Sequence, residues 1–217
     1  MIKLVAFDLD GTIGDTIPMC ISAFKKAIEP YVMRKLSEKE IIQTFGLNEE
    51  GMIRQVTDQN WEKALDDFYL YYTQMHEMCP RPFSGIIELI QQLKRNSLFT
   101  ALITGKGEKS CSITLNRFGI SNYFDAVETG SPYKNRKSEA INNLLERFHL
   151  QADEILYIGD TVSDVLSCKE VGVRCFSAAW AQNILIEELL SVNAGNVVKS
   201  IPDLERKLKS INVLPHG

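Results

Sequence analysis

Residues 3–12 read KLVAFDLDGT, an apolar run that stops at two aspartates, a glycine and a threonine. A run that is apolar on both faces is typical of a strand in a parallel sheet covered by helices on each side. In open sheets of that kind, ligands bind at the carboxyl ends of the strands. Asp8 and Asp10 are two positions apart and can project to the same side of the strand end, and Gly11 permits the turn that follows. The sequence therefore predicts a first strand that delivers two carboxylates to a binding edge.

Short apolar runs of the same kind recur along the chain and alternate with helical patterns. Further strands are expected at Phe99–Ile103, Ala126–Glu128, Ile155–Ile158 and Val173–Phe176, with a weaker one at Asn196–Lys199. Helices are expected at Gly85–Asn96, Lys109–Phe118, Ser138–Phe148, Asp164–Val171 and Ile201–Ile211. The alternation predicts an α/β fold with a doubly wound, Rossmann-like parallel sheet.

One stretch breaks this alternation. Residues 16–81 carry helical patterns only, and Pro80 and Pro82 punctuate their end. The simplest account is a helical domain inserted after the first strand. We therefore expect a Rossmann-like main domain built from residues 1–15 and 82–217, and an inserted α-helical domain at residues 16–81.

Polar residues follow the other strands at the points where those strands end. Thr104 and Gly105 come after the second run, and Asp160 and Asp164 follow the fourth. If a helix starts near Asp160, both acids lie on one of its faces; alternatively, Asp160 merely caps that helix. With the two aspartates of the first strand, four carboxylates would share one edge and repel each other in the absence of a cation. Oxygen ligands of this type suit Mg²⁺, which also binds phosphate.

Groups that can bind an anion lie beside these carboxylates. The Thr104 hydroxyl and the free backbone N–H groups around Gly105 can hold a phosphate oxygen. Lys137, which directly precedes a predicted helix, is the preferred lysine for the same anion, with Lys134 as the alternative. Lys106 either contacts a substrate or is solvated. A carboxylate nucleophile, a second acid, a metal, a hydroxyl and a lysine form a set suited to phosphoryl transfer.

In these motifs the sequence resembles the haloacid dehalogenase (HAD) superfamily of phosphohydrolases, from about Lys3 to Lys199. Asp8-Leu9-Asp10-Gly11-Thr12 looks like the first motif, Thr104 fits the second, Lys137 the third, and Gly159-Asp160 through Asp164 the fourth. The resemblance implies that Asp8 attacks phosphorus and that Asp10 serves as general acid and base. It also implies a Mg²⁺ ion held by the Asp8 carboxylate, the Asp10 backbone carbonyl and Asp160. Asp164 would be a ligand through water or a neighbour of the ligands.

The resemblance extends to the helical domain at residues 16–81, which is similar to the small helical cap of phosphoglycolate phosphatase-like members. It implies that residues 16–81 are the cap and that residues 1–15 and 82–217 are the catalytic core. It implies a phosphatase that hydrolyses a small phosphorylated metabolite through a phospho-aspartyl intermediate, with phosphoglycolate as the first candidate substrate. A phosphomutase of the β-phosphoglucomutase type is the main alternative, and a non-catalytic binding protein on the same fold is another. Relatives select substrates through the cap. There, Phe45–Asn48 and Arg54 either face the active site or belong to an ordinary interhelical turn.

Composition and charge narrow the range of partners. The 217 residues are 45% hydrophobic and 24% charged, and the net charge of −4 offers no general attraction for nucleic acid or an anionic membrane. Five scattered cysteines without a C-x-x-C pair disfavour a disulfide framework or a structural zinc site. The apolar N-terminal run is too short for a signal peptide, and no segment is long enough to span a bilayer. We expect a cytoplasmic monomer or weak homodimer.

Overall fold

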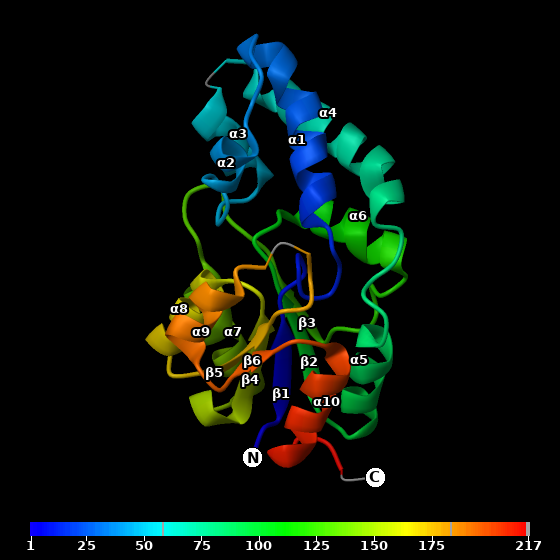
Figure 1. Cartoon of the computed structure of the whole chain (residues 1–217), viewed down its shortest axis with the longest axis vertical. Coiled ribbons are helices and arrows are strands. Elements are labelled where there is room, and N and C mark those ends of the chain that lie inside the picture. The colour runs from blue at the N-terminus through cyan, green and yellow to red at the C-terminus, as the bar shows by residue number, and fades with distance from the viewer. Residues whose placement is uncertain (58, 183, 216–217) are drawn as a thin grey trace.

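A computed structural model of the chain describes residues 1–57, 59–182 and 184–215. At its centre is a six-stranded parallel sheet in the order β3-β2-β1-β4-β5-β6 (Figure 1). The strands are β1 (Leu4–Phe7), β2 (Phe99–Ile103), β3 (Ala126–Glu128), β4 (Ile155–Gly159), β5 (Arg174–Ala178) and β6 (Val197–Val198). The chain moves outward from β1 in one direction through β2 and β3, and in the other through β4 to β6. The point where the direction reverses, between β1 and β4, is where open α/β sheets bind ligands.

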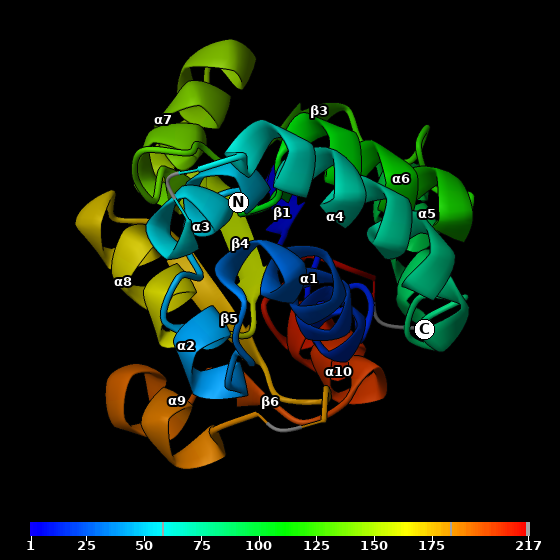
Figure 2. The same ribbon diagram turned by 90° about the horizontal axis from the view of Figure 1, so that it is seen from above.

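Helices cover both faces of the sheet. On one face lie α5 (Ile86–Arg95), α6 (Glu108–Phe118) and α10 (Ile201–Ser210), and on the other lie α7 (Lys137–Phe148), α8 (Val162–Glu170) and α9 (Ile186–Asn193). Figure 2 shows the two sets on opposite sides of the strands. Val5 and Phe7 pack in the first layer, whereas Leu4 and Ala6 pack in the second. All four are fully buried, which is why β1 is apolar at every position.

A helical cap lies above the carboxyl edge of the sheet, built by the chain between β1 and β2 (Figure 1). It contains α1 (Ile17–Val32), α2 (Glu38–Ile42), α3 (Glu49–Val56), α4 (Trp61–Met75) and the 3₁₀ turn η1 (His76–Met78). The two long helices, α1 and α4, pair through the edge-to-face rings of Phe24 and Phe68, 6.3 Å apart. Ser37 begins α2 with a capping box, and Asn48 caps α3. The cap thus has its own apolar contacts and its own helix signals.

The α/β class, the parallel sheet and the inserted helical cap are confirmed, whereas two details differ from the prediction. Helix α9 is absent from the prediction, although Ile186, Leu189 and Leu190 stand at helical spacing in it. With 8 residues it is shorter than the window over which such a periodic pattern is read. Helix α8 begins at Val162 with Thr161 as its N-cap, so the capping role considered for Asp160 is wrong. The limits of the cap at residues 16 and 81 stay a prediction. No helix in the described part of the chain is both long and apolar enough to cross a membrane.

Candidate active site

Three carboxylates meet at the carboxyl edge of the sheet, between β1 and β4. Asp8 follows β1, Asp160 follows β4, and Asp164 lies in the first turn of α8. Because Phe7 is in register with Ile158, Asp8 lies level with Gly159, the residue just before Asp160. One oxygen of each carboxylate lies within 4.8 Å of the other two. All three side chains are buried, so water screens their mutual repulsion only weakly.

A tight turn after β1 lets the backbone approach this cluster. Gly11 has a φ of +75°, and its N–H donates a hydrogen bond to the Gly14 carbonyl at 2.8 Å. A Cβ at position 11 would lie 2.1 Å from an Asp160 carboxylate oxygen. Glycine is therefore required there for both its conformation and its lack of a side chain.

Asp164 is the most firmly held of the three acids. Its backbone and carboxylate form a capping box with Thr161, and the Tyr157 hydroxyl donates to a carboxylate oxygen at 2.8 Å. Burial alone would raise the pKa of Asp164, but the Lys137 ammonium and these hydrogen bonds lower it. Asp164 is thus a fixed negative charge at the back of the site.

Asp8 and Asp160 are less well compensated. Burial raises the pKa of Asp8 to about 7, against the opposing effect of Lys137. Burial, followed by the charges of Asp8 and Asp164, raises the pKa of Asp160 well above its usual range. Asp160 Oδ1 is buried and has no hydrogen-bond partner among the described residues. A divalent cation fits these residues, because it would satisfy that oxygen and offset the buried negative charge.

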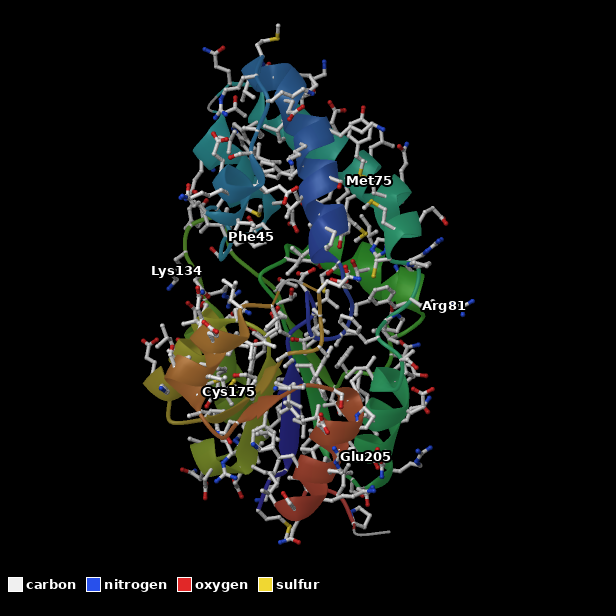
Figure 3. The ribbon with its side chains drawn as sticks, viewed as in Figure 1. Phe45, Met75, Arg81, Lys134, Cys175 and Glu205 are labelled. Atoms are coloured by element: carbon white, nitrogen blue, oxygen red, sulfur yellow. The ribbon has the colours of Figure 1, made fainter. Side chains whose placement is uncertain are left out.

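Lys137, the first residue of α7, points into the acidic cluster. Its Nζ lies 2.9 Å from Asp8 Oδ2 and also contacts Asp164. Burial would lower the pKa of Lys137, but the two carboxylates raise it, so the ammonium stays charged. Lys134 instead has a side chain that is 68% exposed, and its Nζ pairs with Glu139 at 2.9 Å (Figure 3). The structure therefore brings Lys137, rather than Lys134, to the carboxylates.

Asp10 and Lys106 form a second charged pair beside the cluster. Lys106 Nζ lies 3.1 Å from Asp10 Oδ1, which also accepts a hydrogen bond from the Thr16 hydroxyl. The ammonium lies 3.0 Å from Cys20 Sγ and 4.6 Å from the centre of the Tyr72 ring. Burial would lower the pKa of Lys106, but Asp10 raises it well above its usual range. Since the side chain is only 5% exposed, the solvated alternative for this lysine is wrong.

A cavity of about 130 Å³ lies between the core and the cap. Its core side is lined by Asp8, Asp10, Gly105, Lys106, Lys137, Asp160 and Thr161, and its cap side by Ile17, Cys20, Phe24, Phe45, Leu47, Glu49, Met52 and Phe68. Phe45 lies at the edge of the cap that faces the core (Figure 3). The Phe45–Asn48 stretch thus faces the cavity through Phe45 and Leu47. Arg54 does not line the cavity and pairs with Glu50 at 3.0 Å.

Thr104 lies just behind this cavity. It follows β2 and is buried, and its hydroxyl accepts a hydrogen bond from the Lys106 N–H at 3.2 Å. With Gly105 and Lys137 it lines a small adjoining cavity of about 10 Å³. The loop is held by Gly130, whose N–H donates to the Lys106 carbonyl at 2.7 Å. A Cβ at position 130 would lie 1.9 Å from the Gly105 carbonyl oxygen, so this position also requires glycine.

The cap is attached to the core beside the cavity through Glu49, the first residue of α3. One of its carboxylate oxygens accepts a hydrogen bond from the Gly107 N–H at 2.9 Å, and the other accepts one from the Ser110 hydroxyl. Gly107 is the N-cap residue of α6 and, as a glycine, cannot cap the helix with its own side chain. Glu49 therefore caps a core helix from the cap, where the helix dipole favours a negative charge.

Comparison with known proteins places this arrangement in a family. Residues 5–178 match the family described as haloacid dehalogenase-like hydrolases. The chain belongs to this hydrolase family. The resemblance drawn from the four motifs is therefore confirmed.

The names of similar proteins are consistent with membership of this hydrolase family. A phosphoglycolate phosphatase from Vibrio parahaemolyticus is 27% identical over 195 residues, 84% of this chain and 86% of the relative. The pyrophosphatase PpaX from Halalkalibacterium halodurans is 25% identical over 206 residues, 94% of this chain and 95% of the relative. The crystal structure of a hydrolase from Pseudomonas syringae matches with a TM-score of 0.80 at 20% identity, covering 96% of this chain and 99% of that one. The likeness to that structure shows a shared fold.

In this haloacid dehalogenase-like hydrolase, the strand-end motifs predict the acidic cluster and Lys137, but they do not predict Glu49 or most of the other cap residues of the cavity. For Lys106 they leave two interpretations open, although its position directly after Thr104-Gly105 is a usable signal. Glu49 gave no signal, because an acid in the first turn of a helix is ordinary and is explained by its own helix dipole.

Proposed function

We propose that this hydrolase is a Mg²⁺-dependent phosphatase that hydrolyses a small phosphomonoester through a phospho-aspartyl intermediate at Asp8. The observation that carries the proposal is the position of Asp8. It lines the cavity, lies 2.9 Å from the Lys137 ammonium, and belongs to a cluster of buried acids. Phosphoryl transfer depends on such a set of positioned charges. Relatives named phosphoglycolate phosphatase and pyrophosphatase support the same class of reaction.

Asp8 is the proposed nucleophile, and Asp10 is the proposed general acid and base. An Asp8 oxygen bonds to phosphorus while the bond from phosphorus to the leaving-group oxygen breaks, and Asp10 gives its proton to that oxygen. In the second step Asp10 takes a proton from a water molecule. The water oxygen then bonds to phosphorus, the bond to Asp8 breaks, and phosphate leaves.

Mg²⁺ is the cofactor that this set of oxygen ligands suits. Asp8 and Asp160 would hold it through their carboxylates and Asp10 through its backbone carbonyl, with Asp164 as a ligand through water or a neighbour. When bound, Mg²⁺ neutralises negative charge on the transferring phosphoryl group. The unpartnered Asp160 oxygen and the raised pKa values of Asp8 and Asp160 support a cation at this position.

Phosphate binding is assigned to Thr104, Gly105 and Lys137. Lys137 and the backbone at Gly105 line the cavity, and Thr104 lies directly behind them. The Lys137 ammonium can contact a phosphoryl oxygen while it remains paired with Asp8, so it places nucleophile and phosphorus side by side.

The substrate is proposed to be small. A cavity of about 130 Å³ has to hold the phosphoryl group and the leaving group together. Phosphoglycolate has a short leaving group and is the first candidate. A phosphomutase needs polar cap groups that orient a sugar phosphate, whereas the described cap residues of the cavity are mainly apolar. That composition favours hydrolysis over the mutase alternative.

The test is hydrolysis of p-nitrophenyl phosphate by the purified protein, with Mg²⁺ and with EDTA. We expect turnover only with Mg²⁺, and a loss of at least about a thousandfold in Asp8→Asn. Asp15→Asn is the matched control, because Asp15 lies in the same loop but does not line the cavity. In Asp10→Asn, a hydroxylamine-sensitive phosphoenzyme should accumulate. Turnover that persists in EDTA, or in Asp8→Asn, would contradict the proposal.

A further inference from the structure

Two ammonium groups line the cavity, and the proposed phosphoryl transfer uses only one of them. Among the described residues of the cavity wall, Lys106 and Lys137 carry the positive charges. Lys137 is bound to Asp8 and Asp164, the acids around the phosphoryl position. Lys106 instead lies beside Asp10 and against cap helices α1 and α4. The second lysine therefore faces the part of the cavity that a leaving group would occupy.

Lys106 is built into this wall rather than placed there by chance. Lysines are rarely buried unless they are paired, because the ammonium is strongly hydrated. Here the side chain is 5% exposed and its ammonium lies against the Tyr72 ring and the Cys20 sulfur. Its ionic partner is Asp10. The Asp10 oxygen that Lys106 contacts also accepts a hydrogen bond from the Thr16 hydroxyl. Asp10 and Lys106 both line the cavity, so this ion pair lies in its wall.

The proposed acid, Asp10, fixes the distance between Lys106 and the leaving group. An oxygen that takes a proton from Asp10 has to come within about 3 Å of a carboxylate oxygen of that residue. Lys106 Nζ lies 3.1 Å from Asp10 Oδ1. A group one or two bonds beyond the leaving oxygen therefore comes within reach of the ammonium. Such a group would be stabilised if it were anionic, as a charge-assisted hydrogen bond in a site with little water.

Among the described residues that line the cavity, Glu49 is the charged side chain that comes from the cap, and it would repel an anion. Its two oxygens, however, are bound to the Gly107 N–H and the Ser110 hydroxyl, at the N-terminus of α6. The partial positive charge of that helix end offsets part of its charge. Lys106 thus stays the group best placed to contact an anion on the leaving group.

We propose that Lys106 recognises a negative charge on the leaving group by forming an ion pair with it. This hydrolase would then prefer phosphate compounds whose leaving group carries a carboxylate or a second phosphate. The inference rests on the proposed function. Phosphomonoesters of neutral alcohols would be poorer substrates, because their leaving groups carry no negative charge for Lys106 to bind. Specificity in this site would then come partly from the core loop after β2, and not from the cap alone.

The experiment compares kcat/KM for three substrates: phosphoglycolate, 2-hydroxyethyl phosphate as its neutral counterpart of similar size, and pyrophosphate. We expect the native protein to prefer an anionic leaving group by about tenfold or more, the size of effect that one buried charge pair gives. Lys106→Met should lower kcat/KM for the anionic substrates about tenfold more than for the neutral one, and Lys106→Arg should retain most of the preference. The anionic substrate with the higher kcat/KM shows whether the negative group on the preferred leaving group is a carboxylate or a phosphate.

Lys109→Met is the matched control, because Lys109 lies in the same region but is 58% exposed and stacks on Tyr69 outside the cavity. Circular dichroism and thermal melting establish that each variant is folded. An equal loss for charged and neutral substrates in Lys106→Met would overturn the inference, since it would leave Lys106 only a supporting role for Asp10. Failure of the proposed function gives a different result, namely that the native protein hydrolyses none of the three.

Discussion

The core side of the cavity carries nearly all of its charge, whereas the cap side is almost entirely apolar. The core contributes carboxylates and ammonium groups from the ends of β1, β2 and β4 and from the start of α7. The cap contributes side chains such as Phe24, Phe45, Met52 and Phe68, with Glu49 as the charged exception. That exception is bound to the core helix α6 rather than directed at the cavity centre.

The difference between the charged core side and the apolar cap side indicates that the two sides of the cavity have different tasks. Charged groups that act on phosphorus have to be held in fixed positions, and strand ends of a buried sheet hold them rigidly. An apolar wall imposes no such geometry, so its residues can differ in size without disturbing the charges. Lys106 breaks this division, because it is a core residue that faces the leaving group. If this contrast holds, changes to the core side chains and changes to the cap side chains should have different effects on activity.

The largest effect is expected from Lys137→Met. Removing this ammonium leaves Asp8 and Asp164 buried without their cation, so activity toward p-nitrophenyl phosphate should fall by at least about a thousandfold. Without divalent cations, the free energy of unfolding should fall by about 3–5 kcal/mol, as for other broken buried ion pairs. Steady-state kinetics and urea unfolding measure the two losses.

Lys134→Met is the matched control for that variant. Lys134 lies in the loop just before α7, but its ammonium pairs with Glu139 at the surface, where a pair contributes about 1 kcal/mol or less. Activity and stability should therefore change little. A large loss of activity in Lys134→Met with a small one in Lys137→Met would reverse the assignment of the third-motif lysine.

The next largest effect is expected in how the melting temperature depends on pH and on Mg²⁺. Burial raises the pKa of Asp8 from 3.8 to about 7 in the folded protein, so between about pH 4 and pH 7 the folded state holds a proton that the unfolded state has lost. Stability from this group is complete below about pH 4 and is lost as pH rises through about 7. Without divalent cations, the melting temperature should thus fall across this range.

Added Mg²⁺ should reverse that loss, because it binds the ionised carboxylates. We expect Mg²⁺ to raise the melting temperature by several degrees at about pH 8 and by much less at about pH 5. Asp160→Asn should abolish most of this difference, since Asp160 is one of the proposed ligands. A stabilisation by Mg²⁺ that is equal at both pH values would argue against a cation site at the buried acids.

The core half of the site could be predicted from the sequence, because its residues stand next to the strands that position them. Strand β1 is apolar at every position because helices cover both of its faces, and the acids stand directly after β1 and β4. The order of strands then brings Asp8 and Asp160 together without any information from side-chain contacts. Gly11 belongs to the same local pattern, because its conformation is set by the turn.

The cap half could be predicted only as a set of helices. Whether Phe45 or Arg54 faces the cavity depends on how the cap packs on the core, and no periodic pattern encodes that packing. The contact of Glu49 with Gly107 joins residues 58 positions apart. The sequence leaves Lys106 ambiguous for the same reason, since its ammonium is buried against Cys20 and Tyr72 of the cap.

A moderate effect is expected from Glu49→Gln, which tests the charged contact between cap and core beside the cavity. The amide keeps the shape but weakens the hydrogen bonds to the Gly107 N–H and the Ser110 hydroxyl, so the cap should close less firmly. We expect KM to rise by about threefold to tenfold and stability to fall by about 1 kcal/mol. Glu50→Gln is the control, because Glu50 pairs with Arg54 away from the cavity. If both variants behave alike, Glu49 has no special role in cap closure.

The smallest effect is expected from Phe45→Ala, which tests the apolar wall. Phe45 is 39% exposed, so its removal should hardly change the melting temperature. Loss of an apolar contact of about 40 Å² with an aryl leaving group is worth about 1 kcal/mol, or about fivefold in KM for p-nitrophenyl phosphate. Leu70→Ala is the control, because Leu70 is an exposed cap residue outside the cavity. Since kcat depends on the core charges, a fall in kcat as large as the rise in KM would show that the cap wall also positions the phosphoryl group.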